Sequence, residues 1–351
     1  MTAAVSPAAA SSGAPLLSIR DLRVSFSGAN GMTPAVRGID LDVSRGEVLG
    51  IVGESGSGKS LSMLASFGLQ ARNAVVGGSV VFRHLELVGR PRREMRALLG
   101  AEIGMIFQDP LSSLNPVMTV GDQIREILFL HRRGLTRAKA TARVLDLLRL
   151  VAIPEPERRI HQYPHEFSGG MRQRVMIAMA VANDPQLLIA DEPTTALDVT
   201  VQAQIMRMLR DLKDKLGLAL VLITHDLGVV AGHADRVAVI YAGLVVEEAE
   251  VHELFAAPRH PYTRGLIAST PKLTGSSDRL YSIPGNPPAL GAVVDGCAFH
   301  PRCGFAQDVC RTVAPPMAVL GRHRSACHFA ASLPPWNGIN QVAPLEKSDN
   351  G

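Results

Sequence analysis

Short apolar runs and helical patterns alternate along most of the chain. Residues 48–52, 187–190 and 218–223 are uninterrupted apolar runs of strand length, a pattern typical of strands buried on both faces. Between the second and third runs, apolar residues recur every three or four positions from Ile205 to Leu216, as expected of an amphipathic helix. This alternation predicts an α/β fold with a mostly parallel sheet.

The remaining pattern divides the chain into parts of different character. Short predicted strands cover residues 17–89, whereas residues from about 91 to 182 show helical patterns without a convincing strand. We therefore expect an inserted helical subdomain there. Residues 1–16 and 334–351 are expected to be flexible tails, and the uncharged start lacks the basic residues of a secretory signal.

The composition is that of a globular protein without a membrane span of its own. Of 351 residues, 46% are hydrophobic and 19% charged, and no uninterrupted apolar run reaches the roughly 18 residues of a membrane span. The formal charge is +4, and the densest basic stretch, Arg90–Arg96, also contains Pro91 and Glu94. With only 4% aromatic residues in the chain, we interpret this stretch as a solvated face rather than a nucleic-acid footprint. Any membrane role is expected to be peripheral.

One glycine-rich segment fits the phosphate-binding pattern G-x-x-x-x-G-K-[ST]. Its residues are Gly53, Glu54, Ser55, Gly56, Ser57, Gly58, Lys59 and Ser60. The predicted strand 48–52 precedes it, and apolar residues at Leu61, Leu64, Ala65 and Gly68 predict a helix behind it. In this context the loop directs backbone N–H groups at phosphate oxygens, and the lysine and the hydroxyl complete the cradle.

A second glycine pair begins a predicted helix. Ser168 is a candidate N-cap, Gly169 and Gly170 allow a ligand to approach the first amides, and such a helix end attracts anions. Together with Gln173, this stretch resembles the signature sequence of ATP-binding cassette (ABC) ATPases. Stretches that resemble the family's other motifs accompany it in the family's order: Phe107–Pro110 (Q-loop), Leu187–Glu192 (Walker B strand), Pro193–Asp198 (D-loop) and His225 (switch histidine).

This resemblance implies a role for each residue of an ATP site. Lys59 and Ser60 would bind phosphate and Mg²⁺ together with Asp191, a carboxylate suited to a hard cation. Glu192 would polarise the attacking water, and Gln108 would sense both the metal and that water.

Three further features complete the implied site. His225 follows an apolar run, so it would emerge at the C-terminal end of a strand and contact the γ-phosphate. Phe26 resembles the aromatic residue that stacks on adenine, although a place in the strand core accounts for it equally. The signature motif would cap the ATP bound by the opposite subunit, so the working unit would be a dimer with two ATP molecules between its halves.

The last part of the chain holds all four cysteines, separated by five, six and sixteen residues: Cys297, Cys303, Cys310 and Cys327. With His260–Leu266 and Ile283–Leu290 upstream, this part resembles the C-terminal extension of ATPase subunits of oligopeptide and dipeptide permeases, a group that includes nickel importers. The resemblance covers roughly residues 17–330. It implies an ATPase domain over residues 17–250, in which an antiparallel β subdomain accompanies the mostly parallel sheet, and an extension over residues 251–333.

The cysteines suggest a metal. Clustered thiols in a chain without an export signal argue against disulfides, because the cytosol keeps cysteines reduced. Four thiolates suit an iron–sulfur cluster or a tetrahedral zinc, but the tight C-x-x-C spacing of zinc sites is missing. The family resemblance implies a structural 4Fe-4S cluster, with zinc and free buried thiols as the alternatives.

The resemblance also implies an assembly. The partners would be two membrane-spanning permease subunits, a second ATPase subunit of different or identical sequence and, indirectly, an extracytoplasmic solute-binding protein. The chain would lie at the cytoplasmic face of the cell membrane, energise import of dipeptides or oligopeptides, and pass motion to the permease through Leu111–Val120. A nickel importer is the alternative within the family. No nucleic-acid partner is expected, because ABC proteins that act on DNA or ribosomes usually carry two cassettes or a long coiled coil, and the sequence shows one cassette without sustained heptads.

Overall fold

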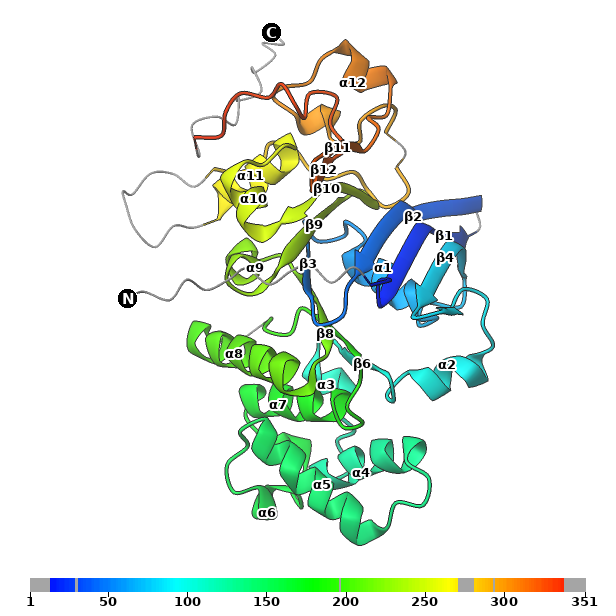
Figure 1. The fold of residues 1–351 in the computed structure, drawn as a ribbon, viewed down its shortest axis with the longest axis vertical. Helices are drawn as coiled ribbons and strands as arrows, with labels where there is room; N and C mark the ends of the chain where they lie inside the picture. Colours follow the sequence, from blue (N-terminus) through cyan, green and yellow to red (C-terminus); the bar gives the residue numbers. More distant parts are fainter. Residues whose placement is uncertain (1–12, 29–30, 196, 271–280, 293, 338–351) are drawn as a thin grey trace.

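The computed structural model describes residues 13–28, 31–195, 197–270, 281–292 and 294–337, with the backbone alone at residues 110 and 111. Two sheets lie next to each other, and a lobe of helices lies below them (Figure 1). The strands are β1 (Leu17–Gly28), β2 (Gly31–Val43), β3 (Val48–Val52), β4 (Ala74–Phe82), β5 (Leu85–Glu86), β6 (Ile103–Ile106), β7 (Leu187–Asp191), β8 (Ala219–Thr224), β9 (Arg236–Tyr241), β10 (Leu244–Glu250), β11 (Ala318–Leu320) and β12 (His323–Ser325).

The α-helices are α1 (Lys59–Ser66), α2 (Arg92–Leu98), α3 (Pro110–Ser113), α4 (Val120–His131), α5 (Arg137–Leu150), α6 (Pro156–Arg159), α7 (Gly169–Ala180), α8 (Val199–Leu216), α9 (Leu227–His233), α10 (Val251–Ala256), α11 (Pro261–Ser269) and α12 (Asp308–Thr312). Two short 3₁₀ helices are η1 (Pro164–Glu166) and η2 (His300–Arg302).

The larger sheet has eight strands in the order β11-β12-β10-β9-β3-β8-β7-β6. Strands β9, β3, β8, β7 and β6 run parallel, and β10, β12 and β11 continue the sheet antiparallel. The smaller sheet, β2-β1-β4-β5, is antiparallel. The predicted mostly parallel sheet is thus confirmed, together with an antiparallel second sheet.

The parallel strands are buried on both faces because successive side chains point to opposite sides. On β3, Leu49 and Ile51 belong to the core shared with the smaller sheet, whereas Val48 and Val52 belong to the core shared with the helices. Strands β3, β8 and β7 are direct neighbours. Their carboxyl ends therefore meet at one edge of the sheet, the place where open α/β sheets bind ligands.

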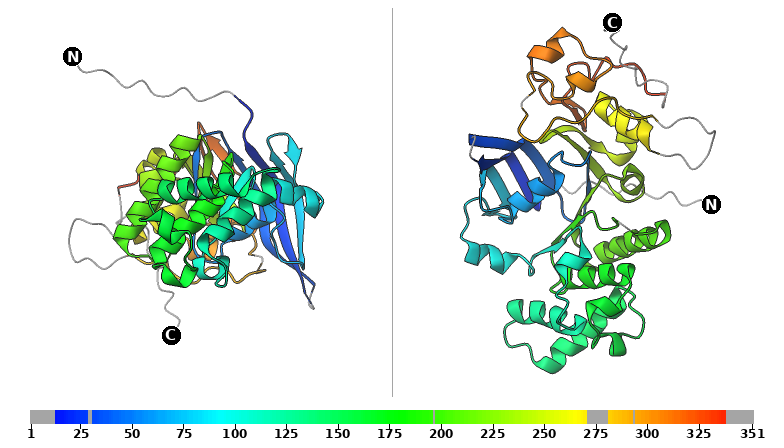
Figure 2. Two further views of the ribbon diagram at one scale, coloured as in Figure 1. Left: turned by 90° about the horizontal axis from the view of Figure 1, so that it is seen from below. Right: turned by 180° about the vertical axis from the view of Figure 1, so that it is seen from behind.

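The helical lobe contains α4, α5, α6 and α7, and it lies below the sheets both in Figure 1 and in the right-hand view of Figure 2. The expectation that residues 91–182 contain no strand is wrong, because β6 lies within this stretch and pairs in parallel with β7. Four residues are too few to show a strand period in the sequence. Pairing with a neighbouring strand, which is a tertiary effect, decides the conformation here.

Side-chain caps begin several helices where the sequence places a short polar residue. Ser168 accepts a hydrogen bond from the backbone N–H of Met171 at 3.4 Å, which confirms it as the N-cap of α7. Thr119 caps α4 and Asp198 caps α8 in the same way. These oxygens satisfy first-turn donors that have no partner inside the helix.

Helix α1 differs from its apolar pattern. It ends at Ser66, and Gly68 lies beyond it at a φ of 69°. The buried side includes Ser62, Met63 and Ser66 rather than a stripe of leucines. The two serine hydroxyls donate to the carbonyls of Lys59 and Ser62, so their burial leaves no unmade hydrogen bond.

The C-terminal segment, residues 251–337, is built onto the larger sheet, because β12 pairs with β10 and β11 pairs with β12. Of the tail expected over residues 334–351, Pro334 accepts a hydrogen bond from Arg264, and the ring of Trp336 lies 5.6 Å from the same guanidinium. Residues 338–351, and residues 1–12 of the N-terminal tail, lie outside the described residues.

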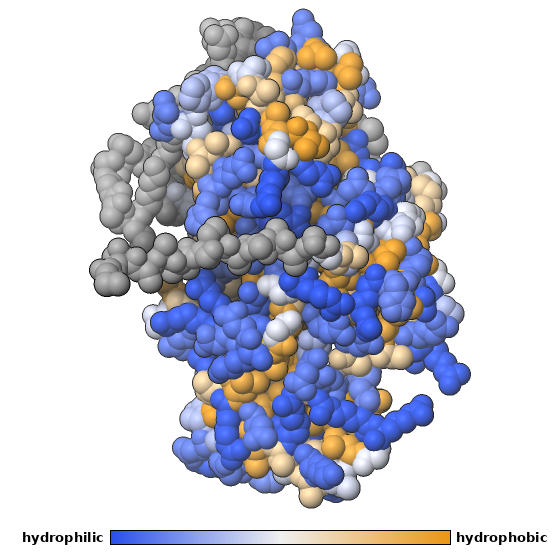
Figure 3. Space-filling view, in the orientation of Figure 1, coloured by the Kyte–Doolittle hydropathy of each residue, from blue (hydrophilic) through white to orange (hydrophobic). Residues whose placement is uncertain are grey.

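The surface in Figure 3 is mainly hydrophilic, with apolar spots scattered over that face. The described helices include none whose length and apolar content would carry it across a lipid bilayer.

Candidate functional site

The phosphate loop connects β3 to α1, as predicted. Gly53 has a φ of 154°, and a Cβ placed on it would lie 2.2 Å from the carbonyl oxygen of Ile240 on β9. Gly58 is the N-cap of α1 at a φ of 100°. Glycine is required at both positions because other residues rarely adopt these conformations. The loop can therefore pack against β9 and still present its N–H groups.

Lys59 is buried inside this loop. Its ammonium group donates hydrogen bonds to the carbonyl oxygens of Gly53 at 2.8 Å and Glu54 at 2.9 Å. Burial lowers the pKa of Lys59, while Glu192 and Asp191 act in the opposite direction. The charge is thus held at the centre of the loop, where it can neutralise phosphate.

Asp191 ends strand β7 next to the first turn of α1. Its Oδ1 accepts a hydrogen bond of 2.7 Å from the hydroxyl of Ser60. Burial raises the pKa of Asp191, and the Ser60 hydrogen bond partly offsets this. A carboxylate and a hydroxyl side by side are oxygen ligands suited to Mg²⁺, so these two residues fit the predicted metal.

Glu192 is the most extensively held carboxylate of the site. Gln108 Nε2 and Thr195 Oγ1 each donate to its Oε2 at 2.9 Å, and His225 Nδ1 lies 3.3 Å from its Oε1. Its backbone has a φ of 47°, which is uncommon outside glycine and occurs often at functional sites. Burial would raise the pKa of Glu192, but the hydrogen bonds from Thr195 and His225 prevail and lower it. The structure thus brings together Gln108, Glu192 and His225, three residues far apart in the sequence.

The signature segment lies apart, in the helical lobe (Figure 1). Ser168 and Gly169 are exposed, and a Cβ on Gly170 would lie 2.8 Å from Cγ1 of Val201 on α8. Gln173 is buried, and its Nε2 has no hydrogen-bond partner among the described residues. The exposed helix start, rather than Gln173, is the part available to a partner.

Phe26 lies near the end of β1, half-buried, opposite Thr33 on β2 and Ala74 on β4. It therefore lies outside the buried core of the smaller sheet.

The four cysteines gather around one small cavity, but the predicted 4Fe-4S cluster is wrong. The cavity has a volume of about 10 Å³, close to the roughly 10–15 Å³ that a single water needs. Among the described residues, no group of three or more histidine, cysteine or acidic side chains is arranged to hold a metal ion. Burial raises the pKa of Cys303 to about 12 and that of Cys327 to about 11, so these thiols stay neutral at pH 7.

Sequence reasoning missed three residues that contact the site. Thr195 lies within the D-loop and holds Glu192. The hydroxyl of Tyr262 accepts a hydrogen bond of 2.8 Å from the backbone N–H of Glu54, and Arg302 forms an ion pair with the Glu54 carboxylate. Tyr262 and Arg302 lie in the part of the sequence that resembles the permease ATPase extension. No local pattern in that part shows that they contact a loop more than 200 positions away.

The fold and this site define a P-loop ATPase. The profile of the ABC transporter family matches residues 36–195, and that of the oligopeptide/dipeptide transporter C-terminal region matches residues 246–310. The chain belongs to the family of ABC transporter ATP-binding proteins, in its oligopeptide/dipeptide group.

The relatives of this chain match nearly its whole length. The oligopeptide transport ATP-binding protein OppD of Salmonella typhimurium is 49% identical, with 90% of this chain and 93% of the relative covered. A probable peptide ABC transporter ATP-binding protein of Sinorhizobium fredii, y4tR, is 52% identical over 89% of this chain and 94% of its own. Among solved structures, the dimeric ATP-binding cassette MJ0796 with ADP and Pi matches with a TM-score of 0.61 at 28% identity, covering 67% of this chain and 98% of that one.

Proposed function

We propose that this chain is the ATP-hydrolysing subunit that energises import of dipeptides and oligopeptides through a membrane permease. The observation that carries the proposal is the site itself, in which a phosphate loop, the Asp191–Ser60 pair and the triply held Glu192 meet at the carboxyl edge of the sheet. The relationship to OppD proteins supports the peptide as cargo. Residues 17–250 would act as the ATPase unit and residues 251–333 as an accessory part.

In this proposal each side chain has one task. The loop amides and Lys59 would bind the β- and γ-phosphates, and Ser60 and Asp191 would hold Mg²⁺, which would supply positive charge to the phosphates. Glu192 would accept a proton from the water whose oxygen bonds to the γ-phosphorus while the bond from that phosphorus to ADP breaks. Gln108 and His225 keep the carboxylate turned toward the phosphate, as their contacts with its two oxygens indicate.

The exposed signature segment supports a dimer. Ser168 and Gly169 are exposed at the start of α7, a helix start that can bind an anion. Helix α7 belongs to the helical lobe, whereas this chain's own phosphate loop joins β3 to α1. We infer that they complete the ATP site of a second ATPase subunit, and that this second chain completes the site described above. Phe26, half-buried at the end of β1, would stack on the adenine ring.

An apolar groove supports docking to a membrane subunit. It has a volume of about 310 Å³ and lies between β6 and the helices α4 and α7. Its lining includes Phe107, which directly precedes Gln108 and is 43% exposed. A helix of the permease seated here would contact Phe107. The next residue, Gln108, donates a hydrogen bond to Glu192, so this contact would couple transport to hydrolysis.

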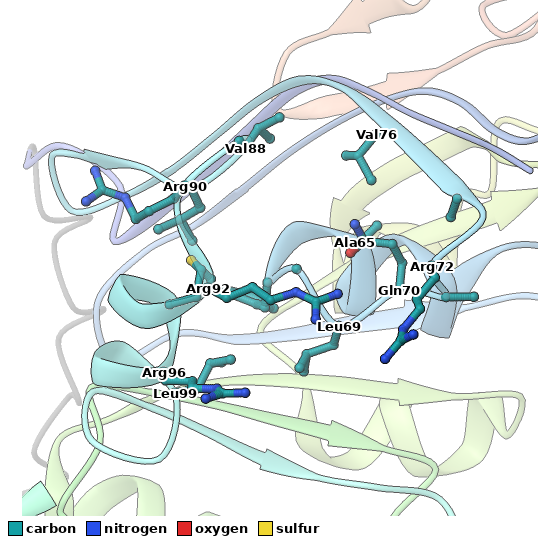
Figure 4. A pocket seen from close by; sticks show the side chains of 17 residues that line it. Ala65, Leu69, Gln70, Arg72, Val76, Val88, Arg90, Arg92, Arg96 and Leu99 are labelled. Atoms are coloured by element: carbon teal, nitrogen blue, oxygen red, sulfur yellow. The ribbon is translucent and has the colours of Figure 1, made fainter.

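A basic cavity of about 550 Å³ continues this groove, because Leu69 and Leu99 line both. Arg72 and Arg92 extend toward each other across it (Figure 4). Together with Arg96, these side chains have no carboxylate partner among the described residues. The docking helix is therefore expected to be amphipathic, with acidic residues opposite the arginines. This contact would keep the chain at the cytoplasmic face of the membrane.

Reconstitution tests the proposal. The chain, its partner ATPase and both permease subunits are placed in vesicles with the solute-binding protein on the opposite side, and uptake of labelled dipeptides, oligopeptides or nickel ions is measured with ATP on the chain's side. We expect ATP-dependent peptide uptake, lost in Lys59→Ala because phosphate binding is lost. The pair Arg72→Glu and Arg96→Glu should weaken assembly while ATP affinity is retained. Uptake unaffected by Lys59→Ala would refute the proposal. Uptake of nickel ions without uptake of peptides would show that the cargo is nickel rather than peptide.

A further inference from the structure

The C-terminal segment reaches the phosphate loop through Arg302. Its Nη1 donates to Oε2 of Glu54 at 2.6 Å and its Nη2 to Oε1 at 2.9 Å, so the pair is bidentate. The Arg302 side chain is 4% exposed and that of Glu54 is 26% exposed. An ion pair with this geometry and burial is shielded from water, unlike the exposed pairs elsewhere on the surface.

Arg302 is itself held in place. Its Nε donates to the carbonyl oxygen of Pro284 at 2.9 Å, and its guanidinium lies 5.8 Å from the ring of Tyr241 and 5.9 Å from that of Phe299. Burial would lower the pKa of Arg302, but the hydrogen bonds that its guanidinium donates to Glu54 and Tyr241 prevail and raise it. The guanidinium is therefore charged and has a defined orientation toward the loop.

Two further contacts join the same parts of the molecule. The buried hydroxyl of Tyr262 accepts the backbone N–H of Glu54 at 2.8 Å. On the side of β2, a Cβ placed on Gly291 would lie 2.3 Å from Cγ2 of Thr33, the residue opposite Phe26. The segment thus holds both the backbone and the side chain of Glu54 and also packs beside the strand that faces Phe26.

Glu54 has an electrostatic cost for a phosphate loop. It is the second residue of the loop, and its carbonyl oxygen accepts a hydrogen bond from Lys59. An unpaired carboxylate there would repel the triphosphate of ATP and compete for the Lys59 charge, because like charges near a partly desolvated site interact strongly. Arg302 cancels this charge.

We propose that Arg302 is a positioning residue for ATP binding: it neutralises Glu54 and, with Tyr262, fixes the phosphate loop, so that ATP affinity depends on the C-terminal segment. This inference rests on the proposed ATPase function and adds to it a residue outside the nucleotide-binding motifs. Arg302 acts through Glu54 and does not reach Glu192. Its loss should therefore affect ATP binding more than the hydrolytic step.

The test uses the full chain, with ATP affinity measured by titration of a fluorescent ATP analogue and with KM and kcat measured in the assembled complex. Arg302→Gln should weaken ATP binding about tenfold, as expected for a lost hydrogen-bonded ion pair that leaves a carboxylate behind. KM should rise more than kcat falls. Arg302→Lys, which keeps the charge but loses the bidentate geometry, should lie between the wild type and Arg302→Gln.

The double variant Glu54→Gln with Arg302→Gln separates charge from folding, because it removes both charges and should regain most of the lost affinity. Arg322→Gln, which removes an exposed ion pair with Glu250 on the same segment, is the matched control and should bind ATP normally. Tyr262→Phe, which removes only the hydroxyl, should weaken binding a few-fold, and it keeps the test valid if Arg302→Gln fails to fold.

Unchanged affinity in Arg302→Gln, or a double variant that binds as weakly as the single one, would overturn the inference. Lys59→Ala, measured in parallel, separates a failure of the proposed ATPase function from a failure of the role of Arg302. If Lys59→Ala loses ATP binding and Arg302→Gln does not, the ATPase function stands and the role of Arg302 fails. If Lys59→Ala binds ATP normally, the proposed function itself fails.

Discussion

Replacing Glu192 by glutamine tests the centre of the proposed mechanism. The substitution changes one oxygen into an amide nitrogen without a change in size. The amide oxygen can still accept the hydrogen bonds that Gln108 and Thr195 now donate to Oε2, which leaves the amide nitrogen on the side of His225. The position of the side chain is therefore largely retained, and what is lost is its negative charge and its ability to accept a proton.

The expected magnitude follows from that loss. A positioned general base typically contributes about 10²- to 10⁴-fold to a rate, which corresponds to about 2.7–5.4 kcal/mol of activation free energy at roughly 1.36 kcal/mol per tenfold. ATP binding should be kept or strengthened, because removal of a carboxylate near Lys59 reduces repulsion of the phosphates. The variant should accumulate with ATP bound.

The pH dependence gives a second measure of the same residue. The pKa of Glu192 is lowered from its ordinary value of 4.5, despite burial, by the hydrogen bonds from Thr195 and His225. The carboxylate form is therefore present above pH 4.5 and is lost only as the pH falls through the lowered pKa. The ratio of wild-type to Glu192→Gln turnover should stay constant between about pH 5.5 and 8.

Steady-state ATPase assays of the assembled complex, together with filter-bound labelled ATP, measure both quantities. Turnover of Glu192→Gln within tenfold of the wild type would remove Glu192 from the role of base. A turnover ratio that falls tenfold between pH 8 and pH 6 would contradict the assigned direction of its pKa.

Three other predictions concern the loop, the dimer and the cysteines. Gly53→Ala should abolish ATP binding, because the added Cβ would lie 2.2 Å from the carbonyl oxygen of Ile240. It should also lower the free energy of unfolding by about 1–3 kcal/mol, as expected for backbone strain at a φ that alanine rarely adopts. Gly77→Ala, where the added Cβ meets open space, is the control in thermal unfolding. Ser168→Arg should block hydrolysis in the partner's site while this chain still binds ATP. Mixed dimers with Lys59→Ala in one subunit show which of the two sites fails. Equal loss of hydrolysis in both sites would contradict the inference that Ser168 completes the partner's ATP site. Gly170→Asp is less suited to this test because its Cβ would lie 2.8 Å from Val201. Cys303 and Cys327 should react slowly with iodoacetamide at pH 8 in the folded chain, because burial raises their pKa to about 12 and about 11. The free energy of unfolding should fall as the pH rises above about 9, because these thiols ionise there in the unfolded chain but not in the folded one. Rapid labelling of the native protein would contradict both expectations.

Local sequence determined much of the ATP site. The loop from Gly53 to Ser60 needs glycine at defined positions and a lysine after them. The N-cap Ser168 accepts a hydrogen bond from a residue only three positions away. Glu192 directly follows an apolar strand. Each of these features depends on residues within a few positions of one another. Their chemistry is therefore visible in a single stretch of sequence.

The tertiary structure decided what depends on contacts between distant segments. β6 is a strand because β7 pairs with it, and the four thiols close on a cavity too small for the cluster that the family resemblance implied. The contact between Arg302 and Glu54 joins residues 248 positions apart. Pairing, cavity size and long-range charge contacts follow from how the layers pack, and packing depends on the whole chain rather than on any one motif.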